Sequence, residues 1–331
     1  MTAKVGVSVI PAAIQFGLLA FCVLILVDAP RTESQILPAD IKSTVGFIFG
    51  KAHVKDQSGV THEIEMPLGT GFFIGWLDKR GGADWGYTYF VTAKHVLRDA
   101  DNRFLKKVKI RLNLLTQQGE RNFDYIEIPV TDDLENLVWF QDPDDLSDEA
   151  IAFPIAPDRK RFNYKVIPND WIVTDQLLKE QQVAEGDSVV FIGLMAQFYG
   201  AKQNFPVVRK GSIALLTDEL LPTPNGPQHG YVCEVASWPG NSGSPVFLYL
   251  GGLRRNTLSN VGFRLLGIVI SYYNNSHTGE TTETATVSFN DPTNIGLAFV
   301  LPAAQITKIL SAPFVQQLRD KFTDEHNKEK R

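Results

Sequence analysis

The sequence predicts an all-β protein folded as an antiparallel sandwich or barrel. Short runs rich in β-branched and aromatic residues recur along the chain between turns, and no run between them has the spacing of a crossover helix. Parallel strands need such crossovers, so strands without them are expected to pair antiparallel. The 331 residues are 44% hydrophobic, which is enough for a substantial core.

The candidate strands form two series along the chain. The first lies at 45–49, 71–74, 87–92, 108–114, 125–130 and 150–155. The second lies at 183–193, 207–216, 231–235, 246–249, 263–271, 282–289 and 296–301. A segment with helical spacing follows at 302–310, and Pro313 interrupts it. The tail at 312–331 is almost entirely charged from Arg319 onward, so we expect a frayed end or a solvated helix there.

An apolar run from Val5 to Val27 follows Lys4 near the amino terminus. As a helix rising about 1.5 Å per residue, this run is long enough to cross a bilayer core of about 30 Å. We expect residues 1–29 to be a hydrophobic helix that serves as an uncleaved signal anchor, with a cleaved signal peptide as the alternative. Residues 30–42 are then a linker. The rest of the chain is expected to be exported and membrane-anchored at the cell envelope or periplasm, or secreted after signal cleavage.

Composition excludes several classes of function. The 37 acidic and 32 basic side chains give a formal net charge of -5, so nucleic acid is not an expected partner. The two cysteines are Cys22, inside the apolar run, and Cys233, so the folded part has no disulfide framework. The six histidines show no paired metal spacing. We therefore expect neither a metal site nor a cofactor.

The strongest local motif is Gly-Asn-Ser-Gly-Ser-Pro at 240–245. A serine hydroxyl is a poor nucleophile, so it needs a nearby base and backbone N–H groups directed at the developing oxyanion. Glycines on both sides of Ser242 let the chain turn tightly enough to point the amides of Gly240 and Ser242 into one small hole. The plain alternative is a Gly-Ser turn between two strands.

A second motif is Phe-Val-Thr-Ala-Lys-His-Val-Leu at 90–97, preceded by Gly69 and Gly71. A strand that ends in a small residue delivers His95 to the edge of a sheet. An imidazole, whose ordinary pKa is about 6.5, suits proton transfer at neutral pH. The plain alternative is a structural histidine at the end of a strand.

Together these motifs resemble those of the trypsin-like serine peptidases, specifically the HtrA/Deg type without a PDZ domain. Four further segments resemble that family, at 186–193, 208–213, 266–269 and 294–302. The resemblance covers about residues 43–311. It implies a chymotrypsin-like fold of two six-stranded antiparallel β-barrels, the first over 43–175 and the second, with a short C-terminal helix, over 176–311.

The resemblance also implies a triad acid in the stretch 146–154. The family's pattern is Asp, an apolar residue and then Ala. Asp148 has an alanine two positions on, but Glu149 occupies the position that is usually apolar. We expect Asp148 to be the acid, with Glu149 as the alternative and Asp144 and Asp145 as more remote candidates.

The implied activity is that of a serine endopeptidase acting on protein or peptide substrates. His95 takes the proton of Ser242 as the hydroxyl attacks, Asp148 holds the ring, and an acyl-enzyme forms. The amides of Gly240 and Ser242 form the oxyanion hole.

By the same resemblance, Ala236, Gly296 and Ala298 line the main side-chain pocket. None of them is a carboxylate, so cleavage is expected after small or medium apolar residues. The uncertain acid, and Ile270 where related enzymes have a small or polar residue, motivate a different class of function. In that alternative the chain is a weak or inactive peptidase-fold protein that acts as a membrane-tethered binding or chaperone-like module. The oligomeric state is not predicted.

Overall fold

The computed structural model describes residues 37–55, 58–82, 85–117, 120–224, 226–254, 257–279 and 289–329. Residues 39–331 form one compact unit. The predicted signal anchor at 1–29, most of the linker at 30–42 and most of the candidate strand at 282–289 lie outside the described residues. Among the described helices, none combines the length and the apolar character needed to span a bilayer.

The first half of the unit is a seven-stranded sheet. Its strands are β1 (Val45–Lys55), β2 (Thr61–Leu77), β3 (Gly86–Ala93), β4 (Lys107–Asn113), β5 (Phe123–Pro129), β6 (Ala150–Pro154) and β7 (Ile167–Pro168). Six of them pair antiparallel in the order β5-β4-β1-β2-β3-β6, and the short β7 pairs parallel with β2. The fully buried Phe47, Phe72, Phe73 and Phe90 lie in this half.

The prediction of a closed six-stranded barrel in this half is wrong for the described strands. The outer edge of β6 does not reach β5, because the segment between the two strands folds back onto it. Phe140 and Ala152 exchange two backbone hydrogen bonds, of 2.8 and 2.9 Å, across that edge. An irregular segment thus takes the place that a closing strand would need.

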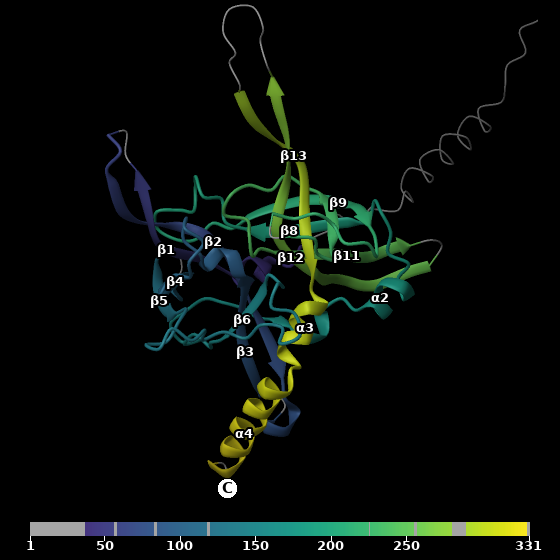
Figure 1. Ribbon diagram of the computed structural model, residues 1–331. Helices are drawn as coiled ribbons and strands as arrows, with labels where there is room; N and C mark the ends of the chain where they lie inside the picture. The colour runs from purple at the N-terminus through teal and green to yellow at the C-terminus, as the bar shows by residue number, and fades with distance from the viewer. Residues whose placement is uncertain are drawn as a thin grey trace, which may run out of the picture. The chain divides into compact units, whose positions relative to one another are not determined.

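The second half is a closed six-stranded antiparallel barrel in the order β10-β13-β12-β11-β8-β9 (Figure 1). The strands are β8 (Ser188–Gly193), β9 (Val207–Leu216), β10 (Tyr231–Glu234), β11 (Pro245–Arg254), β12 (Thr257–Gly279) and β13 (Phe289–Pro302). Their inward side chains form one apolar cluster that includes Phe191, Leu248 and Leu266. The predicted second barrel is confirmed.

Short helical elements connect and flank the strands. They are η1 (Ala39–Thr44), η2 (Lys79–Gly81), η3 (Lys94–Leu97), η4 (Asn169–Trp171) and α2 (Asp175–Glu180). The helix α2 follows the first sheet, and the hydroxyl of Thr174 caps it by accepting the Leu177 amide at 3.2 Å.

Two helices complete the chain, α3 (Ala304–Leu310) and α4 (Pro313–Glu329). The helix predicted at 302–310 is confirmed by α3, and Pro313 occupies the first position of α4, where a missing N–H is tolerated. The prediction of a frayed or solvated tail is wrong for one face of α4. Arg319 and Thr323 are buried, and the Tyr87 hydroxyl of β3 donates to the Arg319 carbonyl at 2.6 Å. Figure 1 shows α4 (yellow) beyond α3, and its contact with Tyr87 lies at the start of β3.

Candidate active site

The candidate site is built where the end of β3, the approach to β6 and the turn before β11 come together. β3 ends at the fully buried Ala93, and the chain enters η3 at once. This anchored turn presents His95, whose side chain is 30% exposed. The strand end thus delivers the histidine to a surface that a substrate can reach, as the sequence predicts.

A single carboxylate orients His95. The ring Nδ1–H of His95 donates to Glu149 Oε2 at 2.8 Å, and the backbone amide of His95 donates to the same oxygen at 3.0 Å. Because an ionised carboxylate only accepts hydrogen bonds, Nδ1 carries a proton, and in the neutral ring the lone pair is on Nε2. The ring is therefore in the tautomer that a general base needs.

The environment keeps Glu149 ionised. Its side chain is only 6% exposed, and this burial alone would raise its pKa. The hydrogen bond from the His95 ring, the attraction of the imidazole in its protonated form, the hydrogen bond from the His95 amide and the Lys94 charge act in the opposite direction and outweigh burial, so the pKa of Glu149 lies below its ordinary value.

Asp148, the expected acid, does not contact His95. Its Oδ1 accepts the amide of Ala150 at 3.1 Å, while its buried Oδ2 has no hydrogen-bond partner. Burial raises the pKa of Asp148 to about 6, despite the Ala150 amide, which lowers it. Neighbouring side chains in an extended segment point to opposite sides, so only one of two consecutive acids can reach the histidine. The structure brings Glu149, the alternative, into that place.

Ser242 lies in the turn that leads into β11. Its backbone carbonyl accepts the amide of Thr70 at 2.9 Å. A Cβ atom on Gly69 would lie 2.7 Å from Val96 Cγ1 and 3.0 Å from the Ser242 carbonyl oxygen. The serine turn and the histidine segment therefore meet at Gly69, which explains why this position lacks a side chain.

The hydroxyl of Ser242 is not joined to His95. Its Oγ donates to the backbone carbonyl of Ile270 at 3.3 Å, and within the described chain no hydrogen bond links it to the imidazole. Ile270 is thus the residue that competes with His95 for the hydroxyl, and it does so through its main chain.

Local geometry holds the serine turn in shape. Gly240 and Gly243 have φ values of 96° and 83°, which residues other than glycine rarely adopt. Asn241 Nδ2 donates to the Leu194 carbonyl at 2.6 Å, and the amide of Trp238 donates to Asn241 Oδ1 at 2.7 Å. The asparagine thus ties the turn to the loop after β8.

Thr70 connects this turn to the first sheet, a role that the sequence analysis did not assign. Its hydroxyl donates to the Gly240 carbonyl at 2.9 Å and accepts the amide of Leu194 at 2.9 Å. Because that carbonyl is held by Thr70, it is not free to turn toward a substrate. The amides of Gly240 and Ser242 have no acceptor among the described residues and stay available as donors. The only sequence signal for Thr70 was its place between two glycines.

The three residues predicted to line the specificity pocket lie in different environments. Ala236 is exposed, and Gly296 is half-buried, with its carbonyl accepting the Val235 amide at 2.8 Å. Ala298 is fully buried in the barrel core beside Cys233. Only Ala236 and Gly296 are thus open to solvent, and the 45% exposed Trp238 lies two residues after Ala236.

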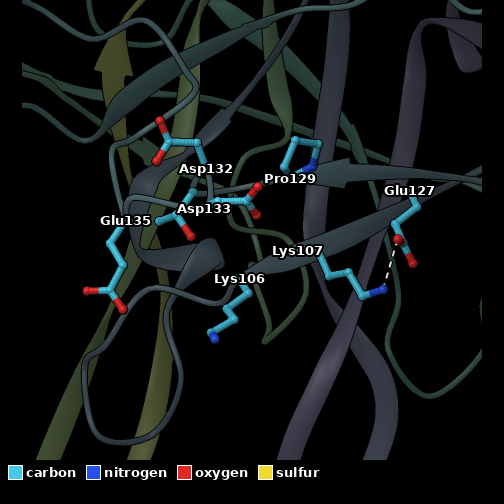
Figure 2. A pocket seen from close by; sticks show the side chains of 8 residues that line it. Lys106, Lys107, Glu127, Pro129, Asp132, Asp133 and Glu135 are labelled. Carbon is cyan, nitrogen blue, oxygen red and sulfur yellow. Dashed lines mark hydrogen bonds and ion pairs between the residues drawn. The ribbon is translucent and has the colours of Figure 1, made fainter.

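A separate charged hollow lies on the first sheet. Figure 2 shows Asp132, Asp133 and Glu135 on one part of it, with Lys107 paired to Glu127 at 2.9 Å on another. None of His95, Glu149 and Ser242 lines it. Across the described residues, no group of three or more histidine, cysteine, aspartate or glutamate side chains is arranged to hold a metal ion.

Comparisons with known proteins give little further guidance. No protein-family model matches the sequence, and none of the curated proteins matches it. Among solved structures, the chain is similar to the MamO protease domain from Magnetospirillum magneticum in its apo form. The two are 16% identical, with 82% of this chain and 97% of that chain covered, at a TM-score of 0.41. A similarity at this level does not establish a family.

Proposed function

We propose that the protein is a trypsin-like serine endopeptidase, of the HtrA/Deg type, with Ser242 as nucleophile, His95 as general base and Glu149 as the orienting acid. The observation that carries the proposal is the pair of hydrogen bonds from His95 to Glu149 Oε2. An imidazole held by a buried carboxylate at Nδ1 is prepared to accept a proton at Nε2.

The proposed cycle begins with a rotation of the Ser242 side chain. Its hydroxyl leaves the Ile270 carbonyl and attacks the peptide carbonyl while Nε2 of His95 takes its proton. The amides of Gly240 and Ser242 stabilise the tetrahedral oxyanion, at about 3 kcal/mol for each donor in a preformed hole. His95 returns the proton to the leaving amine, and a water molecule then hydrolyses the acyl-enzyme in the same manner.

Substrates and location follow from the sequence expectations. We propose cleavage after small or medium apolar residues of exported proteins, because neither Ala236 nor Gly296 supplies a charge near the proposed pocket. The apolar run at 5–27 is proposed to tether the enzyme to the membrane at the cell envelope or periplasm.

One observation favours a second candidate function, a peptidase-fold binding module that turns over no substrate. The Ser242 hydroxyl bonds to the Ile270 carbonyl rather than to the imidazole. If that bond persists when a peptide binds, the serine is not activated, and the protein holds the peptide without cleaving it.

Labelling of the full-length protein with a fluorophosphonate probe separates the two functions, because the probe reacts with activated serines. The proposal predicts a covalent adduct on Ser242, identified by peptide mass spectrometry, and none on Ser242→Ala. The matched control is Ser244→Ala, which alters a fully buried serine of the same turn and should label at the wild-type rate. A folded wild-type protein that stays unlabelled would favour the binding module.

A further inference from the structure

Lys94 is a buried lysine directly before the proposed general base. This residue is only 6% exposed, at the start of η3, the turn that carries the partly exposed His95. Lysine is rarely buried unless its ammonium group has a specific partner. Its partners here all belong to the segment that carries Glu149.

Three hydrogen bonds run from Lys94 to that segment. The ammonium group donates to the Leu146 carbonyl at 2.7 Å and to the Asp148 carbonyl at 2.6 Å. The backbone amide of Lys94 donates to the Glu149 carbonyl at 2.7 Å. Hydrogen bonds to a charged donor are about twice as strong as those between neutral groups. One residue therefore holds the main chain at 146, 148 and 149.

The segment needs such a restraint because it is strongly acidic. Residues 142–149 include Asp142, Asp144, Asp145, Asp148 and Glu149. Like charges at this density repel one another and favour an open, solvated loop. Among the described residues, the ammonium groups that contact the segment are those of Lys94 and of Lys308, which pairs with Asp142 at 2.5 Å. Of these two, only Lys94 contacts the main chain next to Glu149.

We propose that Lys94 is a positioning residue that fixes the Glu149 carboxylate against His95. This inference rests on the proposed function. Lys94 touches neither substrate nor the reacting atoms, and it acts by setting where the main chain on both sides of the acid lies. Since Lys94 and His95 are adjacent, the lysine ties the acid to the same turn that carries the base.

The test is a double-mutant cycle between Lys94→Met and Glu149→Gln, read as the rate of fluorophosphonate labelling of full-length protein. Methionine keeps the length and volume of the lysine stem but cannot donate a hydrogen bond. A displacement of about 1 Å in a catalytic group costs about 100-fold in rate, so Lys94→Met should slow labelling by about that factor. In the Glu149→Gln background, Lys94→Met should cause no further loss, because its effect passes through the carboxylate.

A purely structural lysine gives a different result. If Lys94 only supports the fold, the two substitutions will slow labelling independently, and their factors will multiply. That outcome, or labelling of Lys94→Met at the wild-type rate, overturns the inference. The matched control is Lys107→Met, which removes an exposed lysine of β4 that pairs with Glu127 of β5, and it should leave labelling unchanged.

Two further measurements separate the inference from the proposed function. If the wild-type protein does not label, the proton resonance of His95 Nδ1–H still reports on its bond to Glu149. The inference then predicts that this resonance weakens or moves upfield in Lys94→Met and not in Lys107→Met, and an unchanged resonance overturns it. If Lys94→Met does not fold, Lys94→Gln, which keeps a shorter neutral donor, enters the same cycle with the same two outcomes.

Discussion

Glu149 Oε2 accepts two hydrogen bonds from one residue, the ring Nδ1–H and the backbone amide of His95, at 2.8 and 3.0 Å. The ring bond sets the tautomer and the plane of the imidazole. The amide bond fixes the carboxylate relative to the main chain of η3. The same short turn therefore positions both Glu149 and His95, and a substitution at either residue should displace the side chain of the other.

The two consecutive acids should differ sharply in their effect on labelling of Ser242. In Glu149→Gln the amide can donate to Nδ1, which favours the wrong tautomer, and the rate should fall by about 10⁴-fold. Asp148→Asn keeps the acceptor for the Ala150 amide and does not touch His95, so its rate should stay within a few-fold of wild type. Labelling kinetics at one pH check both. The reverse order of the two variants would return the role of triad acid to Asp148.

Asp148 should make stability depend on pH. Burial raises its pKa from 3.8 to about 6, so the folded state binds more protons than the unfolded state between those values. The contribution of Asp148 to the free energy of unfolding is therefore fully present below about pH 4, and it is lost as the pH rises through about 6. This rise in the pKa corresponds to at most about 3 kcal/mol in the free energy of unfolding.

The variant Asp148→Asn tests this dependence by urea unfolding at pH 4 and pH 7.5. At pH 7.5 it should be more stable than wild type by about 1–3 kcal/mol, since a neutral amide replaces a buried charge. At pH 4 the two proteins should be nearly equal. A constant difference across this range would show that Asp148 does not titrate as the structure indicates.

The turn around Ser242 should tolerate no side chain at Gly243. Its φ is 83°, and a Cβ atom would lie 2.0 Å from the Thr70 carbonyl oxygen, which belongs to the main chain. Gly243→Ala should therefore cost more than about 4 kcal/mol in the free energy of unfolding, or prevent folding.

Gly186→Ala is the control that measures the cost of a positive φ at an alanine without a steric clash. Its φ of 89° is similar, but nothing lies within 4 Å of an added Cβ atom. It should cost only about 1–2 kcal/mol, the price of left-handed backbone for alanine. Equal losses in the two variants, measured by urea unfolding, would contradict the close approach of Thr70.

The buried face of α4 should stabilise the whole unit. Thr323 Oγ1 lies 2.6 Å from the Tyr87 hydroxyl and donates to Asp78 Oδ2 at 3.0 Å, and its residue is 1% exposed. Thr323→Val keeps the shape and removes both contacts, so it should cost about 1–3 kcal/mol. Thermal unfolding measures the loss. Gln317→Ala, an exposed change on the same helix, should leave the midpoint within about 1 °C, since surface changes have small effects.

The sequence predicted the parts of the fold that depend on local pattern. Alternating strands and the flanking glycines placed His95 and Ser242 correctly at a strand end and in a tight turn. The open first sheet could not be foreseen, because it depends on the pairing of Phe140 with Ala152, and Phe140 lies in a segment without strand periodicity.

Two other differences from the sequence-based expectations have equally specific causes. The carboxylate that contacts His95 lies one residue after the expected Asp148, since the alanine spacing favours Asp148 while the side-chain alternation directs Glu149 to the histidine. The tail was interpreted as solvated because Arg319 and Thr323, two of its three buried residues, are polar. Together with Val315 they recur every four residues, which is the spacing of one helical face.

Thr70 couples the packing of the first sheet against the barrel to the conformation of the turn around Ser242. This β2 residue binds the carbonyls of Ser242 and Gly240 and the amide of Leu194, and its own carbonyl accepts the Thr92 hydroxyl at 2.7 Å. Separation of the first sheet from the barrel must break these bonds and release the turn that carries Ser242. Under the proposed function, a partially unfolded molecule would lose the shape of this turn and with it the reactivity of Ser242.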